Sequence, residues 1–220
     1  MANVTLNVTD NQGKATGTVD APAEIFGFSA EEVQSRIPLI HQVVIAQLAA
    51  ARQAPTPPRL VAWFPAVAAS RGSRRHRSCS SGSIRAPQWY HGGTVFGPQP
   101  RDYSQRTPKK MKAAALKYVL SDRANAGRVA VVDFGVSEAP STKAAVAALT
   151  PVTENKFTTV VLSRENVNEW LSVRNIPTVH PIFADQLNTY DVVTAQYVVF
   201  SKEGFDAFLA AKAEPAAKEA

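Results

Sequence analysis

The chain has 220 residues, of which 45% are hydrophobic, and this suffices for a sizeable core in one large domain or in a domain with an extension. Its single cysteine, Cys79, excludes an internal disulfide framework and fits a reducing compartment. No apolar run approaches the roughly 20 residues of a membrane span, and the N-terminus lacks the pattern of a secretory signal. These features predict a cytoplasmic protein without a membrane partner.

The first quarter of the chain contains signals for two strands and one helix. Residues 4–8 alternate between apolar and polar types, as in a half-buried strand, and a turn at 11–13 leads into a second short strand. From Ile37 to Arg52 the apolar residues recur at helical spacing, and Pro38 is tolerated in the first turn of such a helix.

The periodicity stops over residues 53–106. This stretch contains seven of the chain's 15 prolines and no convincing pattern of a helix or a strand. A structureless stretch of this length is uncommon in a compact domain and indicates a functional extension or disorder. We therefore expect residues 53–106 to form a long extended loop.

The positive charge of the chain is concentrated in and beside this loop. Residues 51–112 contain 12 lysines and arginines against one acid, Asp102, which gives a local net charge of +11 in a chain whose total is +6. Between Glu32 and Asp102 there is no carboxylate. A block of one sign repels itself unless a polyanion neutralises it. The pattern favours nucleic acid as the partner, because each phosphate contact releases condensed counterions.

Regular structure resumes at Thr107 and Pro108, which are typical of a helix N-cap followed by proline at the first helical position. Gly127 is the expected end of this helix. Strands and helices then alternate, with strands expected at 129–134, 157–162, 178–183 and 197–200 and helices at 141–149, 167–173 and 201–211.

This alternation predicts an α/β fold, in which a mostly parallel sheet is flanked by helices. We expect residues 1–52 and 107–212 to form a single globular α/β domain, and residues 53–106 to form an extended RNA-binding loop. Residues 213–220 are expected to be a disordered tail.

The obvious catalytic constellations are missing from the sequence. The glycine-rich stretch 92–97 lacks the lysine that ends a phosphate-binding loop, and no strand precedes it. No pair of the four histidines has metal-ligand spacing, and Cys79 has no candidate catalytic partner. Asp185 and Asp191, near Tyr190, are better explained as loop and cap residues. We therefore predict no enzyme activity, no metal, no cofactor and no small-molecule substrate.

One flank of the loop combines positive charge with aromatic rings. Arg85 is followed closely by Trp89, Tyr90 and His91. Arginine offers phosphate a planar fork of donors, and aromatic side chains offer flat faces to unstacked bases. The alternative interpretation is a solvated charged loop in which the aromatic residues occur by chance.

Three lysines at the start of the next helix also favour a partner that carries phosphate. Lys109, Lys110 and Lys112 lie in its first turns, where the helix dipole already presents positive potential. Their charge is unfavourable in an isolated protein, and an incoming phosphate reverses the sign of that interaction. Screening of exposed lysines by solvent is the alternative interpretation.

Several segments of the chain resemble one protein family. They are residues 41–53, 82–89, 92–98, 100–111, 171–175 and 186–192, of which the match across 82–111 is the most specific. Over most of its length the chain is similar to the ribosomal protein L4 family of the bacterial large subunit. The resemblance implies a structural constituent of the 50S subunit, with a globular α/β domain on the subunit surface and a long arm in ribosomal RNA.

The resemblance also implies the partners of the protein. They are 23S ribosomal RNA, which it would bind during subunit assembly, and neighbouring large-subunit proteins, including L22 beside the polypeptide exit tunnel that the arm reaches. The residues expected to contact ribosomal RNA are Arg52, Arg85, Gln88, Trp89, Arg101, Tyr103, Arg106, Lys109 and Lys110. The cations should contact phosphates, and the aromatic rings should stack or wedge against RNA.

Two other functions stay open at this point. One is an RNA-binding regulator of transcription or translation, including control of its own operon. The other is an RNA-modifying enzyme with a nucleotide cofactor, although residues 134–138 offer only one glycine where such an enzyme needs a glycine-rich turn.

The resemblance fails between Ala54 and Ser81. Members of the family carry a stretch rich in glycine, lysine and arginine there, whereas this chain has apolar residues such as Trp63 and Phe64. Our hypothesis is that residues 54–81 are a frame-shifted reading of the gene, because restoring one base at each of three points yields a string of the family's character. The mass of the tryptic peptide that follows Arg52 tests this hypothesis, and we assign no residue of the loop tip to the tunnel.

Overall fold

The computed structural model describes residues 4–53, 90, 94, 96, 98–135 and 139–217. The chain divides into two units, of which the first is Met1–Gln47 with Arg106–Ala220 and the second is Leu48–Gln105. Three of the residues expected to bind RNA, Arg85, Gln88 and Trp89, lie outside the described residues, as does the segment 54–81 of the frame-shift hypothesis.

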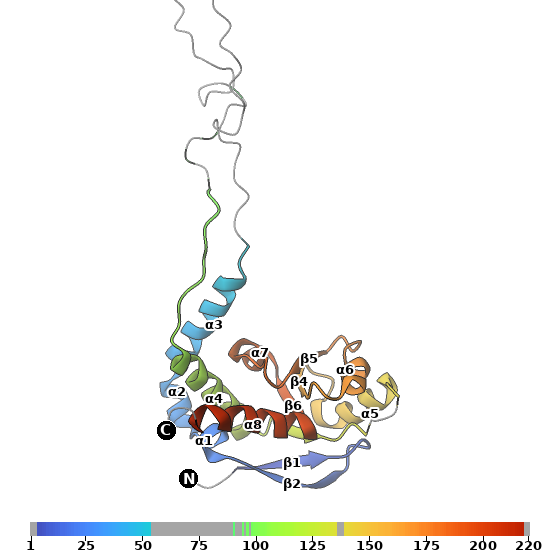
Figure 1. The fold of residues 1–220 in the computed structure, drawn as a ribbon. Coiled ribbons are helices and arrows are strands. Elements are labelled where there is room, and N and C mark those ends of the chain that lie inside the picture. The colour runs from blue at the N-terminus through green and yellow to red at the C-terminus, as the bar shows by residue number, and fades with distance from the viewer. Residues whose placement is uncertain are drawn as a thin grey trace, which may run out of the picture. The chain divides into compact units, whose positions relative to one another are not determined.

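The first unit is built on a six-stranded sheet with the strand order β2-β1-β3-β6-β4-β5 (Figure 1). The strands are β1 Val4–Thr9, β2 Ala15–Ala21, β3 Val129–Val132, β4 Thr158–Leu162, β5 Val179–Phe183 and β6 Tyr197–Ser201. The strands β1 and β2 form an antiparallel hairpin, and the other neighbouring pairs are parallel. The predicted mostly parallel α/β sheet is confirmed.

Helices connect and cover these strands. They are α1 Ala23–Phe26, α2 Ala30–Ser35, α3 Ile37–Ala51, α4 Lys109–Asn125, α5 Thr142–Thr153, α6 Val167–Val173, α7 Thr189–Thr194 and α8 Lys202–Ala217. The expected helices at 37–52 and 167–173 are found with almost the same bounds. The short helices α1, α2 and α7 were not expected from the sequence.

Three helix ends differ from the expectations. Helix α4 begins at Lys109 and not at Pro108, because Pro108 has extended backbone angles (φ −59°, ψ 145°) and itself occupies the N-cap, without a side-chain cap. Helix α5 continues through Pro151 to Thr153, where Glu154 ends it in the left-handed conformation (φ 52°). Helix α8 continues to Ala217, into the stretch expected to be a tail, and the alanines there favour helix.

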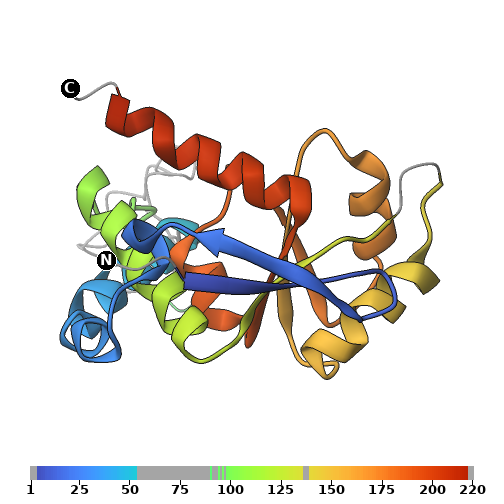
Figure 2. The ribbon, with the colours of Figure 1, turned by 90° about the horizontal axis from the view of Figure 1, so that it is seen from below.

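The core lies on both faces of the sheet, because successive residues of a strand point to opposite sides. Val131, Val161 and Phe200 pack with α1, α4 and α8 in one cluster. Their neighbours Val132 and Val160 pack with α5 and α6 in a second cluster. Figure 2 shows α8 and α5 on opposite sides of the sheet. The valine-rich sequences of the inner strands β3, β4 and β6 follow from this burial on both faces.

Candidate nucleic-acid interface

Three of the residues expected to bind RNA meet in the second unit. The guanidinium carbon of Arg52 lies 4.4 Å from the centroid of the Tyr103 ring, and that of Arg101 lies 4.8 Å from it. Both arginines are exposed, whereas Tyr103 is half-buried. An aromatic face attracts a cation through its quadrupole. The ring therefore holds two like charges close together, and we call these three residues the Tyr103 cluster.

The single acid of the basic segment does not neutralise this cluster. Asp102 accepts hydrogen bonds from Ser104, at 2.8 Å from the backbone nitrogen to Oδ1 and at 2.5 Å from Oγ to Oδ2. These bonds hold the pKa of the Asp102 carboxyl below its usual value. Within the part of the chain that the structure describes, neither Arg101 nor Arg106 forms an ion pair.

The start of α4 adds a second set of uncompensated cations, in the first unit. Arg106 precedes the helix, and Lys109, Lys110 and Lys112 lie in its first turns, all with exposed side chains. The first turn of α4 contains no acidic residue, and Pro108 provides no side-chain cap for its backbone N–H groups. The N-terminal dipole and the ammonium groups thus present positive potential at one place, which favours a phosphate.

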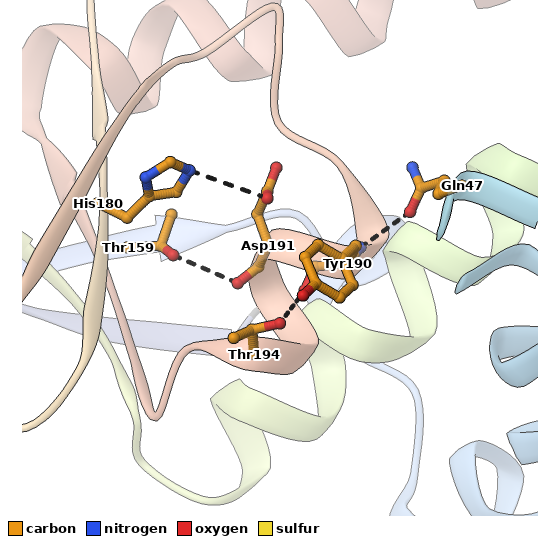
Figure 3. A network of polar contacts seen from close by, with 6 residues as sticks. All are labelled: Gln47, Thr159, His180, Tyr190, Asp191 and Thr194. Carbon is orange, nitrogen blue, oxygen red and sulfur yellow. Dashed lines mark hydrogen bonds and ion pairs between the residues drawn. The ribbon is translucent and has the colours of Figure 1, made fainter. Parts of the chain in front are cut away.

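The family-like segment 186–192 has a structural role that the sequence did not reveal. It contains the start of α7, where the backbone nitrogen of Tyr190 donates to Oε1 of Gln47 on α3 at 3.1 Å (Figure 3). The hydroxyl of Thr194 donates to the carbonyl of Tyr190 at 2.9 Å. Gln47 is the last residue of the first unit before the basic segment. This network therefore fixes the place where the chain leaves the α/β body.

The other half of the same network carries no catalytic arrangement. Nε2 of His180 lies 3.9 Å from Oδ1 of Asp191, and the hydroxyl of Thr159 donates to the Asp191 carbonyl at 3.3 Å (Figure 3). Asp191 lies in the first turn of α7, but the N-cap of this helix is Asn188, so Asp191 is not the cap residue that the sequence favours. A helix at this place could have been inferred, because parallel strands such as β5 and β6 need a crossover connection.

The carboxyl ends of β3 and β6 form the point of the sheet where an α/β protein usually binds ligands. These strands are parallel neighbours, and the helices that follow them, α5 and α8, cover opposite faces. Asp133 follows β3, Ser201 ends β6, and Glu203 lies in the first turn of α8. Glu169 of α6 is buried nearby, and its Oε2 has no hydrogen-bond partner.

The electrostatics at this edge of the sheet oppose a nucleotide cofactor. Burial, followed by the charges of Glu203 and Asp133, raises the pKa of Glu169 to about 7, against the lowering effect of a hydrogen bond from Ser201. The carboxylates of Asp133 and Glu203 at the switch point repel the phosphates that such a cofactor would bring. This feature of the structure therefore counts against the enzyme interpretation.

Two further features bear on function. None of the helices in the described part of the chain is both long and apolar enough to cross a membrane. Among the same residues, no group of three or more His, Cys, Asp or Glu could hold a metal ion.

Comparison with known proteins gives consistent matches. The sequence profile of the ribosomal protein L4/L1 family matches residues 22–210. The large ribosomal subunit protein uL4 of Bifidobacterium adolescentis is 87% identical over 224 aligned positions, which cover 100% of both chains. The uL4 protein of Bifidobacterium animalis subsp. lactis is 69% identical over the full length of both chains. That of Saccharopolyspora erythraea is 49% identical and covers 96% of this chain and 92% of its own.

Proposed function

The chain belongs to the ribosomal protein L4/L1 family, and from this premise we propose that its basic segment, residues 51–112, binds 23S ribosomal RNA. As a member of this family the protein is a structural constituent of the large ribosomal subunit and not an enzyme. Its place on the ribosome also makes it a protein of the cytoplasm.

The observation that carries the proposal is a set of exposed cations without carboxylate partners. In the described part of the basic segment, Arg52 and Arg101 contact only an aromatic ring, and the lysines at the start of α4 have no ion pair. Ribosomal RNA supplies phosphates that such cations can neutralise, and the released counterions drive the binding. We expect these contacts to position the protein and not to read the RNA sequence.

We further propose a division of labour along the chain. Residues 1–52 and 107–212 form the globular body, and residues 53–106 form the arm that enters ribosomal RNA during subunit assembly. In this proposal the arm reaches the polypeptide exit tunnel beside protein L22. Arg85, Gln88 and Trp89 are assigned to RNA binding from their sequence alone, since arginine beside an aromatic ring suits phosphates and unstacked bases.

Sedimentation in a sucrose gradient tests the proposal directly. A tagged copy of the chain, expressed in cells, should sediment with large subunits at moderate salt and leave them only at high salt, because its contacts are mainly electrostatic. A protein that stays at the top of the gradient at moderate salt would contradict the assignment. Binding of the purified chain to 23S ribosomal RNA, measured at several salt concentrations, gives the number of phosphates neutralised.

A further inference from the structure

Two lysines outside the basic segment face the same small cavity. Lys117 of α4 and Lys212 of α8 line a space of about 20 Å³ between these helices, which lie on the same face of the sheet (Figures 1 and 2). The other side chains that line it are Ile25, Ala113, Leu116, Leu120 and Phe208. The two lysine side chains therefore share an apolar floor.

The two charges are not compensated within the protein. Both lysines are half-buried, and Nζ of Lys212 lies 5.6 Å from the centroid of the Phe208 ring. Burial, and then the charge of Lys117, lowers the pKa of Lys212. Among the described residues, neither lysine forms an ion pair with a carboxylate. Such an arrangement costs free energy in the isolated chain, and a bound anion would relieve it.

We propose that Lys117 and Lys212 together bind a backbone phosphate of ribosomal RNA. The inference rests on the proposed function, because it extends the same RNA surface from the start of α4 to α8. Lys110 lies seven residues before Lys117, so the two side chains lie on one side of α4 about 10 Å apart along its axis. A strand of RNA that contacts Lys110 can follow the helix and reach the pair.

The chemistry of the site favours phosphate. Each phosphate offers several acceptor oxygens, so one group can accept hydrogen bonds from two ammonium groups at once. The apolar floor limits the access of water, which strengthens the attraction between the charges. An acidic polypeptide could also neutralise the lysines, but it would not connect with the cations at the start of α4.

The test compares the full-length chain with a double variant, Lys117→Met and Lys212→Met, which keeps the length of both side chains. Its affinity for 23S ribosomal RNA should fall about tenfold at 0.15 M salt, and the salt slope should become shallower by about 0.7–0.9, the loss of one phosphate contact. Without RNA the double variant should unfold at the same temperature as the wild type or a few degrees higher, because the buried repulsion is gone.

Two control variants separate charge from structure. The variant Lys143→Met removes an exposed lysine of α5, which packs in the other core cluster, and it should leave affinity and slope unchanged. The variant Lys117→Arg with Lys212→Arg keeps both charges and should retain the wild-type salt slope.

Several outcomes would overturn the inference. One is wild-type affinity and slope in the double methionine variant, and another is weaker binding with a lower unfolding temperature, which would indicate a structural role. Weaker binding of polyglutamate with unchanged RNA binding would point to an acidic protein partner instead. The variant Arg101→Gln with Lys109→Gln, measured in parallel, distinguishes the failures. If neither this variant nor the double methionine variant changes the salt slope, the proposed function fails. If Arg101→Gln with Lys109→Gln makes the slope shallower and the double methionine variant does not, only the α4–α8 site fails.

Discussion

Two arginines of the α/β body and two of the basic segment differ in what they contact. In the body, Nε and Nη2 of Arg123 donate to the carbonyls of Val192 and Val193, at 3.3 and 2.9 Å, and Arg164 pairs with Asp185 at 2.6 Å. In the described part of the basic segment, Arg52 and Arg101 meet only the ring of Tyr103.

The same residue types thus serve two purposes. A cation that donates to the body's own carbonyls or carboxylates ties elements of the fold together, as Arg123 ties α4 to α7. In the proposed function, a cation left without such an acceptor gains its interaction energy from ribosomal RNA. The difference predicts that stability and RNA binding respond to different substitutions.

Removal of a core ring should give the largest effect on stability. Phe200 of β6 is fully buried, and its ring centroid lies 5.5 Å from that of Phe205 and 5.6 Å from that of Phe208. The substitution Phe200→Ala should lower the free energy of unfolding by about 3–5 kcal/mol, from lost burial and the cavity that remains. Urea denaturation measures this change. A loss below about 1 kcal/mol would mean that the aromatic cluster does not hold the body together.

Removal of positive charge from the basic segment should weaken RNA binding and leave the stability of the fold unchanged. The exposed cations Arg101, Arg106, Lys109 and Lys110, all replaced by Gln, should weaken binding to 23S ribosomal RNA by roughly 10²–10³-fold at 0.15 M salt. The free energy of unfolding should stay within about 1 kcal/mol of the wild type. Filter binding over a range of salt and urea denaturation of the same variant test the two halves. A destabilised variant with an unchanged salt slope would reverse the distinction between the regions.

Within the described part of the chain, the carboxyl group of Glu169 is buried without a cation beside it, and a proton can neutralise its charge instead. Its pKa is raised from 4.5 to about 7, so the folded state holds the proton more tightly than the unfolded state. The resulting stability is complete below about pH 4.5 and is lost as the pH rises to about 7. The wild type should therefore lose up to about 3 kcal/mol over this range.

The variant Glu169→Gln should lack this dependence and should be more stable than the wild type at pH 8. Urea denaturation at pH 5 and pH 8 provides the measurement, and Glu165→Gln, an exposed neighbour, is the matched control. Equal pH profiles for wild type and Glu169→Gln would show that the carboxyl is not protonated at neutral pH.

The parts of the fold that the sequence predicted are those with local signals. Short runs rich in β-branched and aromatic residues indicated β4 and β6, and apolar spacing indicated α3. Helix α7 escaped prediction because it has only six residues and its N-cap, Asn188, makes no side-chain cap. Helix α2 could have been found, since Ser29 and Glu32 form a capping box with reciprocal hydrogen bonds.

The candidate RNA interface could also be predicted from the sequence only in part. The charge of the basic segment is visible in composition, and the structure shows that Arg52, Arg101, Arg106, Lys109, Lys110 and Lys112 are exposed. Contacts between distant residues are not visible in the sequence, so neither the approach of Arg52 to Tyr103 nor the cavity that Lys117 and Lys212 share could be inferred. Their partners are set by the packing of helices and loops, which no short sequence pattern encodes.

The smallest expected effect concerns the ring of Tyr103. Replacing this ring tests whether Arg52 and Arg101 bind RNA better when the ring holds them close together. The substitution Tyr103→Leu removes two cation–π contacts, each worth about 0.5–1 kcal/mol at an exposed site. RNA affinity should fall several-fold, because Arg52 and Arg101 are no longer held together. The salt slope should not change, since no cation is lost. Tyr103→Phe keeps the ring and should bind like the wild type. If Phe and Leu weaken binding equally, the phenol hydroxyl and not the ring face contributes to binding, and the Tyr103 cluster does not preorganise the arginines.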